Sequence, residues 1–536
     1  MRHFSYLLLP TIVVFSAGFT CDKELKGRPC TQGDDCGPGR VCDPVTNTCV
    51  MIGNSDSDTD SDTDTDTDTD SDEALVVGFD AFASYYNVVL IGQLDLDTKY
   101  GFNLEMIPFC TTDDNCYTED ERSEKLGSGD WDVMLTTLDK LALVPTIGKL
   151  TCLVDETDGA DKIVVNPELV MTINDLRGKR ISFMEGSIGE FFLHYLLNLV
   201  LIPVTEVELF PSEDVIAATD LYINETVDAV SGWEPDVDAA VEDGGVVLMD
   251  SGRLRVVVDV ILMSNQVIDQ RADLAQAFQN AWFEALKFQF ENPDTAEEAI
   301  IAWGNNTWSY VHEPGDLTGW LDTIAQATLG HNRLAMSNVD IISARIDDAE
   351  KVWQAAGKII PSVDSVTLIE PRFVLEAGQN PALSTGMMPI NDTFLMTKHP
   401  DLPKLTEEEL GEATTVAILP LRKIDFEPDS ARLTDKARED LSDQVIPVLV
   451  TSRDIYLKID GCAAWPGPPG LYTEEDIRDL AYQRALSVAQ FITGHGIDPD
   501  RLILGTLDPQ FPESENEEEL AQDRIVVFTL IVPSGR

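Results

Sequence analysis

The chain has 536 residues, and its 95 acidic against 37 basic side chains give a formal net charge of −58. Nucleic acid and anionic lipid surfaces would repel such a chain, so neither is expected as a partner. The length allows two or three domains of ordinary size.

The first residues are typical of an exported protein. Met1–His3 is a short basic start, and Tyr6–Phe19 is an uncharged apolar run that ends near small residues. The run is too short for a mature spanning helix, so residues 1–20 are predicted to be a secretory signal peptide. Cys21 lies where a bacterial lipoprotein signal is cut and acylated, which predicts a lipid anchor in the inner or outer membrane and a periplasmic location. The alternative is simple secretion, with Cys21 in a disulfide.

Residues 21–50 form a cysteine-rich segment. Four cysteines follow Cys21 in it: Cys30, Cys36, Cys42 and Cys49. If Cys21 carries lipid, these four can close two disulfides in an oxidising compartment. The segment has no C-x2-C pair and histidine is rare, so no metal or other cofactor is expected.

The other cysteines lie in the body of the chain. Cys110 and Cys116 form a close pair that predicts a loop disulfide. Cys152 and Cys462 have no evident partner in the sequence.

Residues 51–73 are predicted to be a disordered linker. Ser55–Asp72 alternates Ser or Thr with Asp, so the charges repel one another and no apolar face can be buried. The repeat lacks the glycines and the terminal Glu of calcium loops, which favours a spacer over a calcium site. Fully extended, the spacer would reach roughly 60 Å at about 3.3 Å per residue.

From residue 74 to about 378, short β-rich runs alternate with longer helical ones, a pattern typical of an α/β domain. Strands are predicted at residues 75–77, 133–135, 162–165, 181–183 and 228–230. Helices are predicted at residues 188–199, 274–291 and 316–327. Residues 379–412 have weak periodicity and are interpreted as a second linker.

Polar or aromatic clusters follow four of these strands. Because open α/β sheets bind ligands at the carboxyl ends of their strands, the clusters are expected to line one ligand site. The candidate residues are Ser84, Tyr85, Thr136, Thr137, Asp139, Ser187, Trp233 and Glu234. Ser187 opens a helix whose free N–H groups favour an anionic or hydrogen-bond-accepting group, although a plain helix cap explains it equally well.

The same clusters suggest a class of solute. They contain no Lys or Arg to bind a sulfonate or nitrate strongly, whereas Asp139 and Glu234 can accept a cationic nitrogen. A zwitterionic or amine-bearing solute therefore fits best, and a sulfonate is the other class that stays open.

An ordered series of segments carries a family resemblance. It comprises Gly129–Asp139, Asp158–Val165, Asp175–Ile181, Glu185–Ser187 and Val227–Pro235. In order and spacing this series resembles periplasmic substrate-binding proteins of the nitrate/sulfonate/taurine type. The resemblance implies a type II fold of two α/β lobes, the second at about residues 172–250, that close on a ligand by a hinge.

The resemblance also implies a function. Such proteins capture a small solute and present it to the permease of an ABC importer, without covalent chemistry. No nucleophile–base arrangement is evident in the chain, so an enzyme is not expected. Two rivals stay open: an envelope sensor or scaffold that uses the fold without transport, and a pyrimidine-precursor synthase built on the same fold.

Residues 413–536 are predicted to be a compact α+β domain. The expected order is strand 415–419, helix 434–450, strand 454–459, helix 474–493 and strand 524–531. The segments Ile424–Phe426, Lys458–Gly461, Leu480–Val488 and Gly496–Leu502 resemble OmpA-like domains.

The OmpA-like resemblance implies contact with peptidoglycan stem peptides. A helix Arg of that family binds the diaminopimelate carboxylate through its planar guanidinium, and Arg484 occupies this position. Asp479 lies in the helix start, where the family has an Asn, and Ala464 stands where the family has its amine-binding Asp. Peptidoglycan binding, a changed wall ligand and a purely structural module all stay open.

Overall fold

The computed structural model describes residues 40–43, 48–51, 74–110, 116–307, 313–384, 395, 402–427 and 430–534. The predicted signal peptide, Cys21, Cys30, Cys36 and nearly all of the predicted spacer lie outside these residues. The chain divides into two compact units, Met1–Asp70 and Ser71–Arg536, and each is described by itself. None of the described helices combines the length and apolarity needed to cross a membrane.

The described part of the first unit is one antiparallel strand pair. It consists of β1 (Arg40–Asp43) and β2 (Thr48–Met51), and Cys42 lies opposite Cys49 in the register. The disulfides predicted for this unit stay predictions.

The second unit begins with a lobe built on a six-stranded mixed sheet in the order β13-β6-β12-β5-β3-β4. Its strands are β3 (Ala74–Phe79), β4 (Asn103–Pro108), β5 (Val133–Thr137), β6 (Lys149–Thr157), β12 (Val258–Met263) and β13 (Ile324–Gln326). The central strand β12 is buried along its whole length, because helices cover both faces of such a sheet.

Most helices of this lobe are short, and the longest are α9, α13 and α10. They are α1 (Asn87–Gln93), α2 (Leu96–Tyr100), α3 (Glu119–Ser128), α4 (Leu138–Leu143), α8 (Asn265–Gln270), α9 (Ala272–Glu291), α10 (Pro293–Thr307), α11 (Asp316–Leu321), α12 (Leu329–Ser337), α13 (Asp340–Ala355), α14 (Arg372–Ala377) and α15 (Pro381–Ser384). The helix predicted for 316–327 is wrong in its second half. The helix ends at Leu321, and Ile324–Gln326 pairs with β6 instead, because a sheet edge can override local helix propensity.

The second lobe is a five-stranded sheet in the order β11-β7-β10-β8-β9. Its elements are β7 (Asp161–Val165), β8 (Arg180–Met184), α5 (Ile188–Leu199), β9 (Glu208–Ser212), α6 (Val215–Ile223), β10 (Ala229–Trp233), α7 (Asp238–Glu242) and β11 (Val246–Asp250). Ile163 and Val165 pack into the core that contains α5, whereas Val164 packs into the core of α6, as the alternation of a strand requires.

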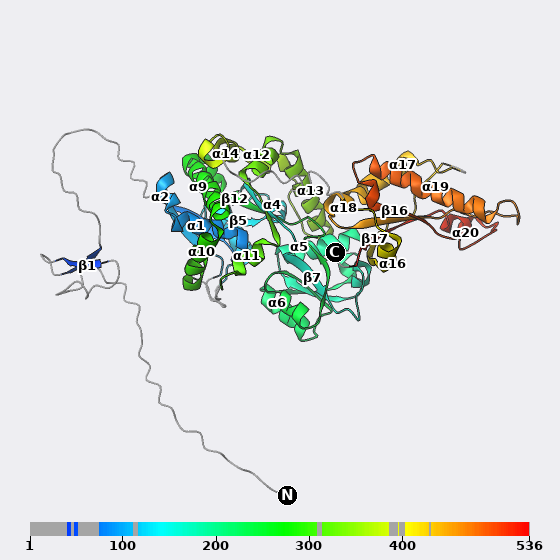
Figure 1. The fold of residues 1–536 in the computed structure, drawn as a ribbon, viewed down its shortest axis with the longest axis horizontal. Helices are drawn as coiled ribbons and strands as arrows, with labels where there is room; N and C mark the ends of the chain where they lie inside the picture. Colours follow the sequence, from blue (N-terminus) through cyan, green and yellow to red (C-terminus); the bar gives the residue numbers. More distant parts are fainter. Residues whose placement is uncertain are drawn as a thin grey trace, which may run out of the picture. The chain divides into compact units, whose positions relative to one another are not determined.

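Two chain crossings join the lobes (Figure 1). The chain leaves the first lobe after β6, enters the second at β7, and returns after β11 to form β12. The predicted arrangement of two α/β lobes is thus confirmed. The second lobe starts at Asp161, before the expected residue 172, since β7 is a central strand of its sheet.

The C-terminal module is a four-stranded sheet in the order β14-β17-β15-β16, with helices packed against it. Its elements are α16 (Glu407–Glu412), β14 (Thr414–Ile418), α17 (Asp435–Gln444), α18 (Ile446–Thr451), β15 (Tyr456–Gly461), α19 (Glu474–Thr493), β16 (Leu502–Thr506), α20 (Glu517–Gln522) and β17 (Val526–Val532). An α+β module is therefore present at the predicted place, and its OmpA-like character stays a prediction.

The module differs from expectation in two places. The helix predicted for 434–450 is two helices that meet at Val445, because Pro447 in the first turn of α18 has no N–H to continue the helix. Ile424–Phe426 is outside the sheet, whose first strand is β14, and Phe426 forms only an isolated bridge with Leu433.

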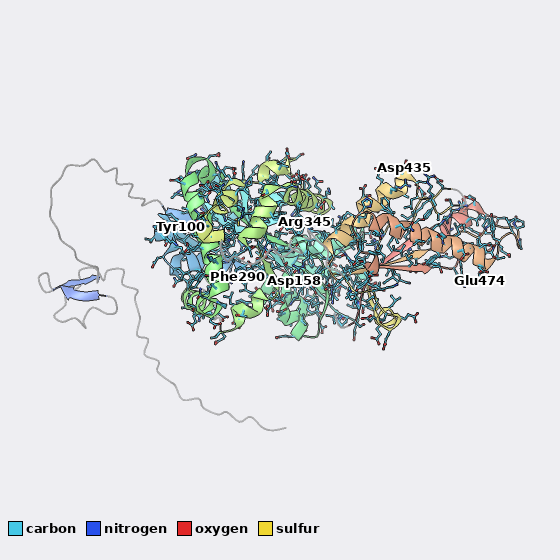
Figure 2. All side chains as sticks on the ribbon, turned by 45° about the horizontal axis from the view of Figure 1, so that its top comes forward. Tyr100, Asp158, Phe290, Arg345, Asp435 and Glu474 are labelled. Atoms are coloured by element: carbon cyan, nitrogen blue, oxygen red, sulfur yellow. A yellow bond between two sulfur atoms is a disulfide. The ribbon has the colours of Figure 1, made fainter. Side chains whose placement is uncertain are left out.

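The C-terminal module and the second lobe share one apolar core. The Asn174 side chain accepts from the Ile418 N–H at 2.8 Å and donates to its carbonyl at 3.0 Å. Backbone bonds run from Arg255 N–H to the Thr451 carbonyl and from Arg453 N–H to the Arg253 carbonyl. Asp158, labelled in Figure 2, binds Arg453 in this region. The module is embedded in the binding lobes rather than loosely attached to them.

Candidate functional site

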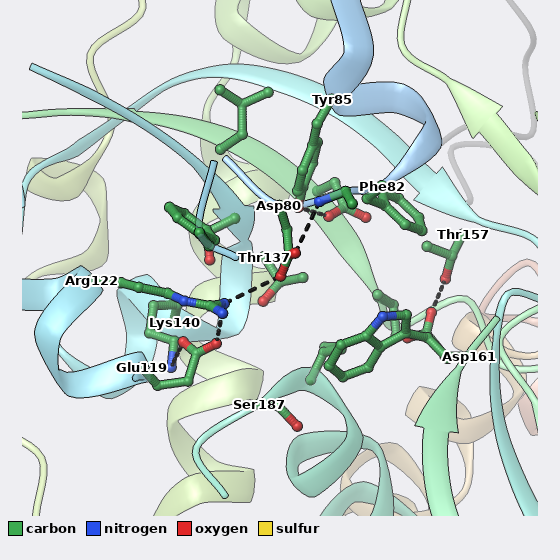
Figure 3. A pocket seen from close by; sticks show the side chains of 18 residues that line it. Asp80, Phe82, Tyr85, Glu119, Arg122, Thr137, Lys140, Thr157, Asp161 and Ser187 are labelled. Carbon is green, nitrogen blue, oxygen red and sulfur yellow. Dashed lines mark hydrogen bonds and ion pairs between the residues drawn. The ribbon is translucent and has the colours of Figure 1, made fainter. Parts of the chain in front are cut away.

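A cavity of about 600 Å³, counted with its open mouth, lies between the two lobes (Figure 3). Its walls come from the carboxyl ends of β3 and β5 in the first lobe and of β8 and β10 in the second. Both crossings also reach it, through Thr157 and Val257. This is the position at which open α/β sheets bind small ligands.

Five of the predicted site residues line this cavity: Tyr85, Thr136, Thr137, Ser187 and Trp233. The other three do not. Ser84 is fully buried, and Asp139 is buried in the first turn of α4. Glu234 binds the ammonium group of Lys162, which also contacts Asp238 at 2.8 Å, so Glu234 already has a basic partner.

Ser187 serves as a helix cap. Its hydroxyl accepts from the Gly189 N–H at 3.1 Å and donates to the Met184 carbonyl at 2.8 Å. Glu190 accepts from the Gly186 N–H at 2.7 Å, so the chain supplies its own anion at this helix start. Burial alone would raise the pKa of Glu190, but hydrogen bonds from His194 and Gly186 and the nearby Lys358 lower it to about 2.

One end of the cavity contains two basic side chains, Arg122 and Lys140, that sequence reasoning missed. Arg122 contacts Glu119 at 2.7 Å and Asp80 at 3.3 Å, and its guanidinium lies 4.2 Å from the Phe109 ring centre. Lys140 contacts Glu119 at 2.7 Å and donates across the cleft to the Gly186 carbonyl at 2.6 Å. Burial opposes ionisation of Glu119, but Lys140 and Arg122 prevail and lower its pKa.

The other end of the cavity is acidic. Asp259 on β12 and Asp161 at the start of β7 line it, and Asp155 on β6 lies directly opposite Asp259 in the sheet. The Tyr85 hydroxyl donates to Asp259, and Thr157 donates to Asp161 at 2.7 Å. Burial raises the pKa of Asp155 and of Asp161 to about 7. Burial and the adjacent Asp155 raise the pKa of Asp259 well above its usual range.

These acids were missed although the sequence carried a signal for them. Asp155 and Asp259 each interrupt an apolar strand, and acidic residues are rarely buried without a partner. An acid inside a buried strand is therefore itself a reason to suspect a site.

Among the described residues, the cavity lining contains no histidine and no cysteine. His194 lies elsewhere, buried against Trp353 at 6.1 Å between ring centres and 3.4 Å from Glu190. No group of His, Cys, Asp and Glu in the described residues is arranged to hold a metal ion.

The disulfide predicted between Cys110 and Cys116 is present. Cys152 and Cys462 are free and buried. Burial raises the pKa of Cys462 to about 12 and that of Cys152 still further, which keeps both thiols protonated and unreactive.

Arg484 and Asp479 are on α19 but in different surroundings. Arg484 is buried, donates to the carbonyls of Ser430 and Cys462 at 3.4 Å each, and lies 4.9 Å from the Phe426 ring centre. Asp479 is exposed.

Residues 162–296 match the model of the NMT1/THI5-like family. This segment covers the second lobe from β7 onward and the return into the first lobe as far as α10. No curated protein sequence matches the chain.

Several solved structures are similar to the two lobes. The periplasmic aliphatic sulphonate binding protein SsuA from Escherichia coli is 17% identical, with a TM-score of 0.44, over 56% of this chain and 92% of that one. The periplasmic nitrate-binding protein NrtA from Synechocystis PCC 6803 is 13% identical, with a TM-score of 0.44, over 57% and 88%. SsuA from Xanthomonas axonopodis pv. citri, bound to MOPS, is 15% identical, with a TM-score of 0.40, over 56% and 98%. At such values the ligands of these proteins do not indicate the ligand of this chain.

Proposed function

We propose that this chain is an exported solute-binding protein of the cell envelope. Its two lobes capture a small solute in the cavity between them and present it to the permease of an ABC importer. The observation that carries the proposal is the cavity itself, which both lobes line at the carboxyl ends of their strands. The NMT1/THI5-like match across residues 162–296 supports the same function.

The lobes already touch across the cavity in a way that suits closure. Lys140 of the first lobe donates to the Gly186 carbonyl of the second, while only two chain crossings connect the sheets. A solute that binds the closed form more tightly than the open form would shift the protein toward the closed form. The size of this shift is set by the difference between the two binding free energies.

A thermal-shift screen of the purified full-length protein tests this function. The library would contain sulfonates, nitrate, amines and pyrimidines. A solute that binds only the folded state raises the melting temperature in proportion to its concentration above Kd. No shift from a library that spans all charge classes would contradict solute binding.

The envelope location rests on the N-terminal sequence. We propose that lipid on Cys21 anchors the chain and that the spacer at 51–73 holds the binding lobes away from the membrane. Replacing Cys21 with Ser should release the protein from the membrane fraction. A protein that stays in that fraction would contradict the lipid anchor.

A second proposed contact is with the cell wall, through the C-terminal module and Arg484. Because this module shares its core with the second lobe, the test uses the full chain bound to purified sacculi. Binding that is lost in Arg484→Gln supports the contact, and binding no stronger than that of an unrelated acidic protein removes it.

A sensor or scaffold function is the second candidate. It is favoured by the continuous core between the C-terminal module and the second lobe, which couples solute capture to whatever holds the module. Solute uptake that is unchanged in a strain lacking the protein would favour this candidate over transport.

A further inference from the structure

The two ends of the cavity differ in how their charges are balanced. At the basic end, Arg122 and Lys140 both contact Glu119 at 2.7 Å, and Arg122 also contacts Asp80. At the acidic end, Asp161 and Asp259 form no ion pair with a Lys or Arg of the described chain. The acidic end therefore lacks a positive charge that would balance its carboxylates.

An anionic solute would find no unpaired Lys or Arg among the described residues that line this cavity. To contact Arg122 or Lys140 it must displace Glu119 or lie beside that carboxylate, and like charges at such distances repel. The helix start at Ser187 is closed to it as well, since Glu190 already accepts from the Gly186 N–H.

The acidic end contains a carboxylate whose neighbour in the sheet is another acid, Asp155, rather than a base. Asp259 is only 2% exposed and lines the cavity, and its Oδ2 has no hydrogen-bond partner among the described residues. Its Oδ1 accepts from the Tyr85 hydroxyl. A buried carboxylate without a partner is unfavourable, so it either keeps a proton or receives a cation.

The groups around this end reinforce its preference for a cation. Asp155 faces Asp259 from β6, and the charge of Asp139 on α4 also acts on Asp259 and on Asp161. Tyr85 and Thr157 contribute neutral hydroxyl donors. Burial and the charges of Asp259 and Asp139 raise the pKa of Asp161 to about 7, so a bound cation would replace protons held by these carboxyls.

The half-buried indole of Trp233 supplies a flat apolar face in the same cavity. It comes from the end of β10 in the second lobe. Trp is the side chain that interacts best with cations through its ring, and it also stacks well on planar groups.

We infer that the cavity binds a small organic cation, with a protonated nitrogen held between Asp161 and Asp259 and an adjoining flat ring against Trp233. This inference rests on the proposed solute-binding function and names its class of solute. Asp161 belongs to the second lobe and Asp259 to the first, so the shared cation draws the lobes together. A sulfonate or nitrate has no equivalent position.

Calorimetric titration of the full-length protein, at mildly alkaline pH and low salt, tests the inference. The probes are benzamidine, benzamide and benzoate, which have nearly the same shape but are cationic, neutral and anionic. Benzylamine and N-methylpyridinium are added as further cations. We expect the best cation to bind at least about tenfold more tightly than benzamide, because charge-assisted hydrogen bonds are stronger than neutral ones.

The variants Asp161→Asn and Asp259→Asn remove one charge each without changing shape. Each should weaken cation binding at least about tenfold and weaken benzamide binding less, because only the cation loses a charge-assisted hydrogen bond. Asp139→Asn is the matched control, because Asp139 is a nearby buried acid that does not line the cavity. This variant should change cation affinity less than about threefold. Thermal melts of the unliganded variants should equal or exceed that of the parent, so weaker binding cannot come from unfolding.

The other outcomes overturn the inference in distinguishable ways. Tighter binding of benzoate, benzenesulfonate or nitrate than of any cation overturns it and leaves the solute-binding function intact. Binding of calcium chloride that is lost in Asp161→Asn, without binding of any organic cation, makes the acidic end a metal site. No binding by any probe overturns the inference, and no shift in the wider solute library also removes the proposed function.

Discussion

The crossing from the first lobe to the second contains two sets of acids, one without a basic partner and one paired with arginine. Asp155 and Asp161 belong to the acidic end of the cavity and have no basic partner among the described residues. Glu156 and Asp158, which lie between them in the chain, contact Arg255 at 3.6 Å and 2.5 Å. Arg453 of the C-terminal module contacts Asp158 as well, at 2.6 Å.

This difference separates a structural acid from an acid reserved for a ligand. An arginine fork beside a carboxylate fixes two elements together, as Arg453 and Arg255 do at the junction with the C-terminal module. An acid buried without a base makes the empty protein less stable, and that loss is recovered when a cation binds. The two sets lie within seven consecutive residues, from Asp155 to Asp161.

Removal of Arg255, which both paired acids share, should have the largest effect on stability. Arg255→Met should lower the free energy of unfolding by about 3 kcal/mol, because it leaves Glu156 buried and Asp158 with one partner. Urea unfolding measures this loss. Arg177→Met, which removes an exposed pair with Glu206, should cost less than about 1 kcal/mol. Equal losses in the two variants would show that burial of the pair does not matter.

For an acid of the cavity, the change in the free energy of unfolding should have the opposite sign. Asp155→Asn should raise the free energy of unfolding by roughly 1–3 kcal/mol at mildly alkaline pH, because the amide removes one of two like charges and can donate to Asp259. The same urea experiment measures the gain. A loss of stability as large as that of Arg255→Met would mean that the acid pair is itself structural.

The pH dependence of stability tests the buried acids of both sets together. Burial raises the pKa values of Asp155, Glu156 and Asp161 to about 7, so between about pH 4 and pH 7 the folded state holds more protons than the unfolded chain. The free energy of unfolding should therefore fall as pH rises through this window, by up to about 1.4 kcal/mol per pH unit for each group. The slope should be shallower in the double variant Asp155→Asn, Asp161→Asn, and an unchanged slope would assign it to other groups.

The smallest effect is expected at the edge of the junction. Asn174→Ala removes two hydrogen bonds to the Ile418 backbone and should cost about 1–2 kcal/mol. The protein should still unfold in one transition, because the shared apolar core remains. Calorimetry that resolves a separate transition for the C-terminal module would show that these bonds hold the two parts together.

Much of the fold could be predicted because its signals are local. The strand at 162–165, the helix at 188–199 and the helix at 474–493 coincide with β7, α5 and α19. Five predicted residues of the cavity wall lie at or just after the ends of β3, β5, β8 and β10, since strand ends converge in this type of sheet.

The charge balance of the site could not be predicted in the same way. Glu234 looked available in the sequence, but Lys162 lies across from it on a neighbouring strand and neutralises it. Asp155 and Asp259 are far apart in the chain and meet only through strand register. Which carboxylate is left without a partner depends on such long-range contacts, and no local pattern records them.

The shared core of the second lobe and the C-terminal module also has a mechanical consequence. A pull on the last strand, β17, is transmitted through that core and through the contact of Arg453 with Asp158 to the chain segments that join the lobes. If the lobes close on a solute as proposed, the second lobe would stay with the C-terminal module whenever that module is held, and the first lobe would move against both. Tension at the C-terminal end would then act on the joining segments before it reaches the first lobe.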